Sequence, residues 1–155
     1  MDARKRIALT AHDAVKPALV AWAFANEAAL AAHHLTATGN TGQLLMRETG
    51  LSLDLVRSCA LGGDMELGAM IAEGAIDILI FFTDPVSRQP HDVDPAPLWR
   101  VATLSQTAVA INEASADFLI RSELMGRHYP RPHGQTALPS SRKRLGAQAD
   151  IPELS

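Results

Sequence analysis

Four times along this chain, an apolar run of strand-like character gives way to small or polar residues that open a helix. The four junctions are Ala11-His12-Asp13, Thr38-Gly39-Asn40-Thr41-Gly42, Gly62-Gly63-Asp64 and Asp84-Pro85. In an open parallel sheet the carboxyl ends of the strands lie at one edge, so the side chains that follow them meet at one crevice. The alternation therefore predicts a layered α/β domain with its functional site at that edge.

Hydrophobic periodicity predicts five strands with helices between them. The expected strands are residues 6–10, 34–37, 53–56, 76–82 and 108–111, and the expected helices are residues 15–32, 42–48, 64–73, 98–104 and 114–121. The run at 76–82 is apolar at nearly every position, which is typical of a strand buried on both faces of a parallel sheet. Gly50 and Gly74 are expected to end helices, because glycine readily adopts the left-handed conformation found there.

The composition of the chain excludes several classes of protein and favours a single compact domain. A chain of 155 residues, 47% of them hydrophobic, suits one compact domain and leaves no room for a second. The net charge is −3 and both signs are spread along the chain, so we expect no binding to nucleic acid. No run is long and apolar enough for a signal peptide or a membrane span. The single cysteine, Cys59, cannot form an internal disulfide, so a cytoplasmic location is expected.

The pattern changes from about residue 126. Prolines, Gly134 and two adjacent serines interrupt every period, and Arg142-Lys143-Arg144 adds a short basic cluster. We therefore divide the chain into an α/β domain, residues 1–125, and a divergent tail rich in proline and arginine, residues 126–155. A solvated end is favoured over an arm that binds nucleic acid or a partner, because short basic runs are common.

The second junction has the composition of an anion site. Residues 38–42 place hydroxyl groups, an amide and free backbone N–H groups at a helix start, where the helix dipole favours an anion. No Gly-Lys-Ser/Thr sequence follows, so this is not a Walker loop. Ordinary capping explains the same residues, since threonine and asparagine are common helix caps. Lys16 lies in a first helical turn, where a nearby anion, or simple exposure, would explain a cation.

Acid–base candidates follow the other junctions. Asp64 is either a helix N-cap or a base facing a ligand whose approach Gly62 and Gly63 permit. Asp84, His91 and Asp94 belong to a proline-bounded segment, residues 83–97, that we interpret as a functional loop. The side chains available to a metal are His12, Asp13, His91 and Asp92. None of them pairs at helical spacing and the only thiol stands alone, so we predict no metal site.

Taken in order, these motifs resemble methylglyoxal synthase. The match runs from about residue 4 to residue 120 and includes Ala11-His12-Asp13 with Lys16, residues 37–42, Leu61-Gly62-Gly63-Asp64, residues 78–82 with Asp84-Pro85, and Pro90-His91-Asp92. The resemblance implies a three-layer α/β/α Rossmann-like domain with a five-stranded parallel sheet in the order 3-2-1-4-5. It also implies a homohexamer without metal or organic cofactor, and a carbon–oxygen lyase that converts dihydroxyacetone phosphate to methylglyoxal and inorganic phosphate.

The resemblance also assigns roles to residues. The catalytic carboxylate falls on Asp64, the catalytic imidazole on His91, and supporting acidic positions on Asp13, Asp84 and Asp94. Contacts to the substrate and its phosphate fall on His12, Lys16, Thr38, Gly39, Asn40, Thr41, Ser58 and Cys59. Such a carboxylate would remove a carbon-bound proton, giving an enediolate, and the imidazole would polarise the carbonyl group.

The chain departs from the family pattern at several positions, and these departures leave two alternative functions to consider. Asn40 stands at a usual threonine, Cys59 at a usual glycine and Ala60 at a usual proline, and the family's last strand and helix find no counterpart after Arg121. One alternative is a non-catalytic module that binds a phosphorylated metabolite for regulation, although sensing needs no base. A structural or protein-binding domain is a weaker alternative, because it would not require polar groups at successive strand ends.

Overall fold

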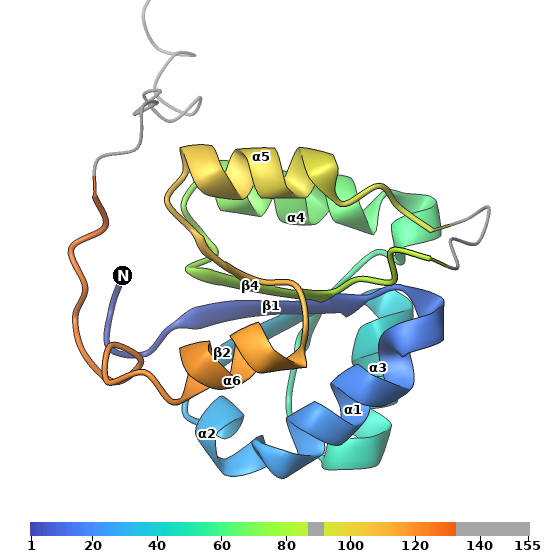
Figure 1. Cartoon of the computed structure of the whole chain (residues 1–155), viewed down its shortest axis with the longest axis horizontal. Coiled ribbons are helices and arrows are strands. Elements are labelled where there is room, and N and C mark those ends of the chain that lie inside the picture. The colour runs from blue at the N-terminus through green and yellow to red at the C-terminus, as the bar shows by residue number, and fades with distance from the viewer. Residues whose placement is uncertain (87–91, 133–155) are drawn as a thin grey trace, which may run out of the picture.

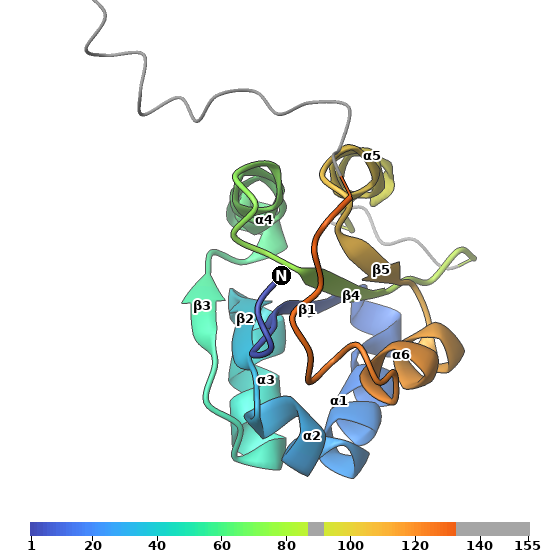
Figure 2. The same cartoon turned by 90° about the vertical axis from the view of Figure 1, so that its left-hand side faces the viewer.

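The computed structural model describes residues 1–86 and 92–132, and a parallel sheet lies at its centre. Its strands are β1 (Arg6–Ala11), β2 (His34–Thr38), β3 (Asp54–Val56), β4 (Ile78–Phe82) and β5 (Ala108–Ala110). They pair in parallel in the order β3-β2-β1-β4-β5, as the end-on view in Figure 2 shows. The α/β class and this strand order confirm the expectation from the sequence.

Helices cover both faces of the sheet. On one face lie α1 (Lys16–Ala25), α2 (Glu27–Ala31), α3 (Gly39–Thr49) and α6 (Glu113–Ile120), and on the other lie α4 (Gly63–Ala72) and α5 (Ala96–Leu104) (Figure 1). Two short 3-10 helices, η1 (Asp13–Val15) and η2 (Cys59–Leu61), precede α1 and α4. None of the helices within residues 1–86 and 92–132 is long and apolar enough to cross a membrane.

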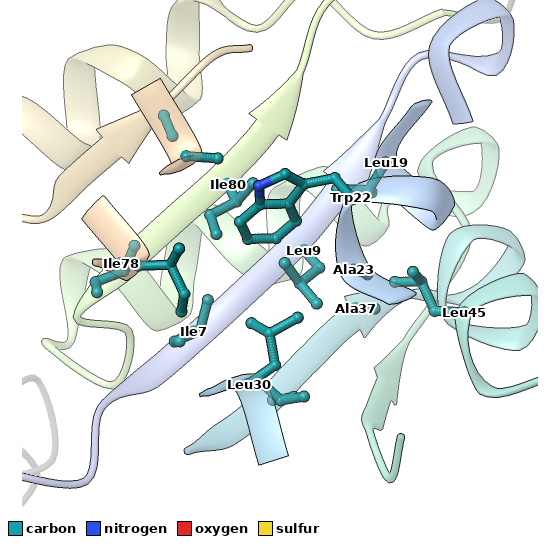
Figure 3. Close-up of a cluster of buried hydrophobic side chains, with 14 of the residues drawn as sticks. Ile7, Leu9, Leu19, Trp22, Ala23, Leu30, Ala37, Leu45, Ile78 and Ile80 are labelled. Carbon is teal, nitrogen blue, oxygen red and sulfur yellow. The ribbon is translucent and has the colours of Figure 1, made fainter. Parts of the chain in front are cut away.

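The alternation of side chains along the central strands builds two cores. Ile7 and Leu9 of β1 face the larger core, where Figure 3 shows them gathered with Trp22 of α1 and Leu30 of α2. The intervening Ala8 faces the smaller core beneath α4 and α5. All five positions of β4 are buried, as expected for a strand covered on both faces. The cores pack on both faces of the sheet, and the carboxyl ends of its central strands lie at one edge, the right-hand edge in Figure 1.

Most expected elements are present, with two informative differences in their bounds. The helix expected at 15–32 is interrupted at Asn26, whose backbone and side-chain N–H groups both donate to the carbonyl oxygen of Trp22. The helix expected at 42–48 begins three residues earlier, at Gly39, so residues 39–42 form its first turn and not a preceding loop. Gly50 and Gly74 adopt φ angles of 72° and 73°, which confirms that they end helices.

The beginning of the chain and residues 126–132 lie side by side. The Met1 amino group donates to the Tyr129 carbonyl oxygen at 2.8 Å, and the Tyr129 N–H donates to the Met1 carbonyl oxygen at 2.9 Å. The Arg131 guanidinium lies 2.7 Å from the buried Asp77 carboxylate. The start of the expected tail is therefore attached to the domain. The division at residue 125 stays a prediction, because residues 133–155 lie outside the described residues.

Candidate active site

A cavity of about 120 Å³ lies at the carboxyl edge of the sheet, beside the ends of β1 and β2. His12, Lys16, Thr38, Asn40, Thr41 and Cys59 line it, and each of them was expected to contact the substrate. Asp13 also lines it, whereas Gly39, Ser58, Asp64, Asp84 and Asp94 do not. The sheet topology thus joins the first two junctions of the sequence around one space, together with Cys59 and Ala60, which shortly precede the third junction.

The start of α3 forms one wall of this cavity. Thr38 is the N-cap residue, with extended backbone angles of φ −69° and ψ 142°, but its side chain makes no capping hydrogen bond. The Gly39 N–H donates to the Arg57 carbonyl oxygen at 3.2 Å. The next two N–H groups, of Asn40 and Thr41, point out of the first turn without a side-chain acceptor in the described part of the chain. An open helix N-terminus of this kind favours an anion.

Thr41 adds a hydroxyl group to the same wall. The residue as a whole is only 2% exposed, and it lines the cavity. Its hydroxyl makes no hydrogen bond to another residue within 1–86 and 92–132, and it is not enclosed by the protein. A hydroxyl of this kind can donate to a ligand oxygen in the cavity.

Lys16 provides a positive charge at the start of α1. Its ammonium group pairs with the carboxylate of Asp13, and its side chain is 18% exposed. Asp13 is thus the neighbouring anion that explains a cation in a first helical turn. Both side chains line the cavity, so the ammonium group remains available to a second anion there.

His12 is held by both ring nitrogens. The Asp84 N–H donates to Nδ1 at 3.0 Å, so Nδ1 is unprotonated and the hydrogen is on Nε2. Nε2 lies 2.9 Å from the Val93 carbonyl oxygen and donates to it. The ring is 3% exposed and packs edge-on against Phe81. A substrate contact through either ring nitrogen would therefore require breaking one of these two hydrogen bonds.

The two glycines before Asp64 allow the start of α4 to pack closely against another part of the protein's own backbone. Gly62 is the N-cap of α4 with φ 89°, which corrects the interpretation of Asp64 as the N-cap and places Asp64 in the first turn. A Cβ atom on Gly63 would lie 1.8 Å from the carbonyl oxygen of Arg57. The backbone that approaches Gly63 is thus that of Arg57, and this contact joins the start of α4 to the chain after β3.

Asp64 itself is partly buried and lies outside the cavity wall. Burial raises the pKa of the Cys59 thiol above its ordinary value. The negative charge of Asp64 adds to this rise, and the positive charge of Lys16 opposes it. Cys59 therefore lies within electrostatic range of both groups, one from α4 and one from α1. The carboxylate expected to act as a base thus lies within electrostatic range of Cys59, a residue that lines the cavity.

Two further acidic candidates accept hydrogen bonds from nearby backbone N–H groups. An Asp84 carboxylate oxygen accepts from the Val86 N–H at 2.8 Å, and one of Asp94 accepts from the Ala96 N–H at 3.1 Å, at the start of α5. Asp92, which the sequence suggested only as a metal ligand, lines the cavity. His91 lies outside the described residues. Within residues 1–86 and 92–132, no three His, Cys, Asp or Glu side chains are grouped as metal ligands would be.

Comparison with known proteins places the chain in a family. A family model described as "MGS-like domain" matches residues 18–112. A methylglyoxal synthase of Actinobacillus pleuropneumoniae serotype 3 is 51% identical over 124 residues, covering 80% of this chain and 82% of that protein. One of Aliivibrio fischeri is 50% identical over 125 residues, covering 81% and 83%. The chain belongs to the methylglyoxal synthase family. The resemblance inferred from the sequence motifs is thereby confirmed.

The likeness to methylglyoxal synthases extends to the whole fold. The crystal structure of the methylglyoxal synthase from Elizabethkingia anophelis NUHP1 has a TM-score of 0.82 and 40% sequence identity, covering 99% of this chain and 97% of that one. Cys59, at a usual glycine of the family, brings no backbone strain, because Gln106 is the one non-glycine residue with positive φ in the described part of the chain. This departure from the methylglyoxal synthase pattern is thus compatible with the local backbone.

Proposed function

We propose that this protein is a methylglyoxal synthase, a carbon–oxygen lyase that eliminates phosphate from dihydroxyacetone phosphate. The observation that carries the proposal is the cavity wall formed by the open N-terminus of α3, the Thr41 hydroxyl and the Lys16 ammonium. These groups suit a phosphate, and they occur in a chain about half identical to proteins named methylglyoxal synthase. The three-carbon part of the substrate would extend from this wall toward Cys59 and Asp64.

The phosphate group first anchors the substrate in the site and then departs as the leaving group. Lys16, the hydroxyls of Thr38 and Thr41, and the first amides of α3 would hold its oxygens. These groups stabilise the charge that grows on phosphate as its carbon–oxygen bond breaks, and they are preorganised by the fold. By resemblance, Gly39, Asn40, Ser58 and Cys59 complete this side of the site.

The proton chemistry falls to Asp64 and His91. The Asp64 carboxylate would take a proton from the hydroxymethyl carbon beside the ketone, and the electron pair would form an enediolate. By resemblance, His91 would polarise the carbonyl oxygen and move a proton between the two oxygens. Breaking the carbon–oxygen bond then sends its electron pair to phosphate. The enol left behind gains a proton at the terminal carbon and becomes methylglyoxal.

A homohexamer without metal or organic cofactor is proposed from the same resemblance, and a cytoplasmic location from the single cysteine. Large apolar side chains on several elements support burial between subunits: Phe24 of α1 is 63% exposed and Phe118 of α6 is 83% exposed. Leu61 and Met65, on either side of Asp64 in the sequence, are 72% and 71% exposed. A symmetric assembly of subunits would bury such exposed apolar side chains. Light scattering in solution would measure the number of subunits.

The test is incubation with dihydroxyacetone phosphate, measuring both products. We expect methylglyoxal and inorganic phosphate in equal amounts, at a rate far above the spontaneous elimination. Phosphate binding by calorimetry without any turnover would leave the regulatory module as the better description. Release of phosphate without methylglyoxal would indicate a phosphatase and contradict the proposal.

A further inference from the structure

A threonine at a helix N-cap usually accepts a hydrogen bond from the second or third amide of the helix. Thr38 occupies this position in α3 with the extended backbone that capping requires, yet it does not cap. Its hydroxyl points instead across the sheet to β1. A hydrogen-bonding group in β1 therefore competes with the amides of Asn40 and Thr41 for this hydroxyl.

The competitor is Thr10, the penultimate residue of β1. Its Oγ1 lies 3.0 Å from the Oγ1 of Thr38, and the two residues are 1% and 2% exposed. The strands β1 and β2 pair with Leu9 opposite Ala37, so Thr10 and Thr38 come next on both strands and share one face of the sheet. Thr10 does not line the cavity, whereas Thr38 does. Thr10 can therefore affect a ligand only through its neighbours.

Cys59 joins this contact as a third side chain. Its Sγ lies 3.9 Å from the Oγ1 of Thr10, and hydrogen bonds with both Thr10 and Thr38 lower the pKa of its thiol by less than burial raises it. Burial keeps the pKa of this thiol above its ordinary value, so the thiol is protonated at neutral pH and can donate. If the Cys59 thiol donates to Thr10 and Thr10 donates to Thr38, the Thr38 proton is free to point into the cavity. Successive hydrogen bonds in one direction strengthen one another.

We infer that Thr10 is a positioning residue for the phosphate site, because it holds the Thr38 hydroxyl away from α3 and keeps the first turn of that helix open. The amides of Asn40 and Thr41 would otherwise be occupied by the protein's own cap. The inference rests on the proposed function for the identity of the ligand, a phosphate group. The sequence motifs that match the family do not include Thr10, and Cys59 is a departure from the family pattern.

The decisive variant is Thr10→Val, which removes the hydroxyl and keeps the size and the branched shape of the side chain. The freed Thr38 can then cap α3 and compete with the ligand. We expect the affinity for inorganic phosphate, measured by calorimetry, to fall about threefold to tenfold, the range of one hydrogen bond. The melting temperature should stay the same or rise. The KM for dihydroxyacetone phosphate should rise with little change in kcat.

Thr36→Val is the matched control. Thr36 is a buried threonine on the same face of β2, two residues from Thr38 and opposite Ala8 of β1, and it does not line the cavity. We expect this variant to bind phosphate as the wild type does. Thr10→Ser, which restores the hydroxyl, should recover most of the affinity. In a Thr38→Val background, Thr10→Val should cause no further loss, because the group through which it acts is gone.

Each result decides the inference. Unchanged phosphate affinity in Thr10→Val, or an equal loss when Thr38 is already valine, would overturn it. A fall in melting temperature together with affinity, matched by Thr36→Val, would make Thr10 a merely structural residue and overturn it as well. If the wild type neither binds phosphate nor converts dihydroxyacetone phosphate, the proposed function itself fails. If the wild type does both and Thr10→Val is indistinguishable from it, only this inference fails.

Discussion

The polar side chains at the cavity differ in whether the protein already occupies their hydrogen-bonding atoms or leaves them available to a ligand. Thr41 lines the cavity with a hydroxyl that bonds to no other described residue, and Lys16 shares its charge with one carboxylate. The His12 ring nitrogens, by contrast, are both engaged with backbone groups. The first two residues are therefore suited to bind the phosphate, and the third is suited to hold the ends of two segments together.

Asp64 is the residue on which the proposed chemistry depends. Asp64→Asn keeps the size of the side chain and removes its basicity, so turnover should fall about 10²- to 10⁴-fold. Inorganic phosphate should bind as before, because the phosphate side of the cavity is on other elements. Rate measurement with calorimetry on the same sample checks both. A variant that retains more than about a tenth of the wild-type rate would remove Asp64 from the role of base.

His12 should show one fixed tautomer. Nitrogen-15 NMR of the histidine side chains is expected to find Nδ1 of His12 unprotonated and Nε2 protonated, both before and after inorganic phosphate is added. The exposed His34 serves as the internal control, since its tautomers should exchange freely. Protonation of Nδ1 when phosphate binds would show that His12 leaves its backbone partners to contact the ligand.

At the level of elements, the segment after β3 fixes the starts of two helices relative to each other. The Arg57 carbonyl oxygen accepts from the Gly39 N–H of α3 and lies against Gly63 of α4. The Arg57 guanidinium also pairs with Glu66 of α4 at 3.1 Å. The cavity wall on α3 and the Asp64 carboxylate on α4 are thus joined through one short stretch of backbone.

Gly63→Ala tests this junction. The added methyl group would lie 1.8 Å from a carbonyl oxygen, so the backbone must move, and we expect a loss of about 1 to 3 kcal/mol in the free energy of unfolding. Gly68→Ala in the same helix is the control, because its Cβ would meet Leu98 at an ordinary 3.6 Å. That change should be neutral or stabilising by up to about 1 kcal/mol. Urea unfolding of both variants measures the difference, and equal stabilities would contradict the close approach at Gly63.

For the whole molecule, a buried carboxylate connects both ends of the described chain. Asp77 is fully buried at the amino end of β4 and accepts hydrogen bonds from Arg6 of β1 and from Arg131. Burial alone would oppose its ionisation. The hydrogen bonds and charge of Arg6, with the charge of Arg131, outweigh this effect and lower the pKa of the Asp77 carboxyl below its ordinary value.

The lowered pKa makes the contribution of Asp77 to stability depend on pH. A carboxyl with a lower pKa in the folded state stabilises the fold above its unfolded pKa, about 3.9, and loses this contribution as the pH falls through the folded value. Asp77→Asn should therefore reduce the melting temperature at pH 7, and its difference from the wild type should shrink at pH values below about 4. Glu73→Gln, an exposed change at the end of α4, is the control. A difference that stays constant down to acid pH would contradict this account.

The alternation of apolar and polar residues by itself determined the fold class, the edge of the sheet that carries the site, and most of the residues that gather there. Such patterns are local, and their consequences for topology follow from the handedness of the chain and the burial of apolar surface. The family motifs added the reaction and the expected roles. The sequence predicted no role for Thr10, because a threonine in an apolar strand has no local signature of function.

Only the tertiary structure decided which group each of these residues meets. The Thr38 hydroxyl meets Thr10 of another strand, the His12 nitrogens meet the backbone of Asp84 and Val93, and Gly63 meets Arg57. These partners are set by strand register and by the packing of helices on the sheet, which bring together residues distant in sequence. A hydrogen bond depends on tenths of an ångström between such residues, and no periodicity along the chain specifies that distance.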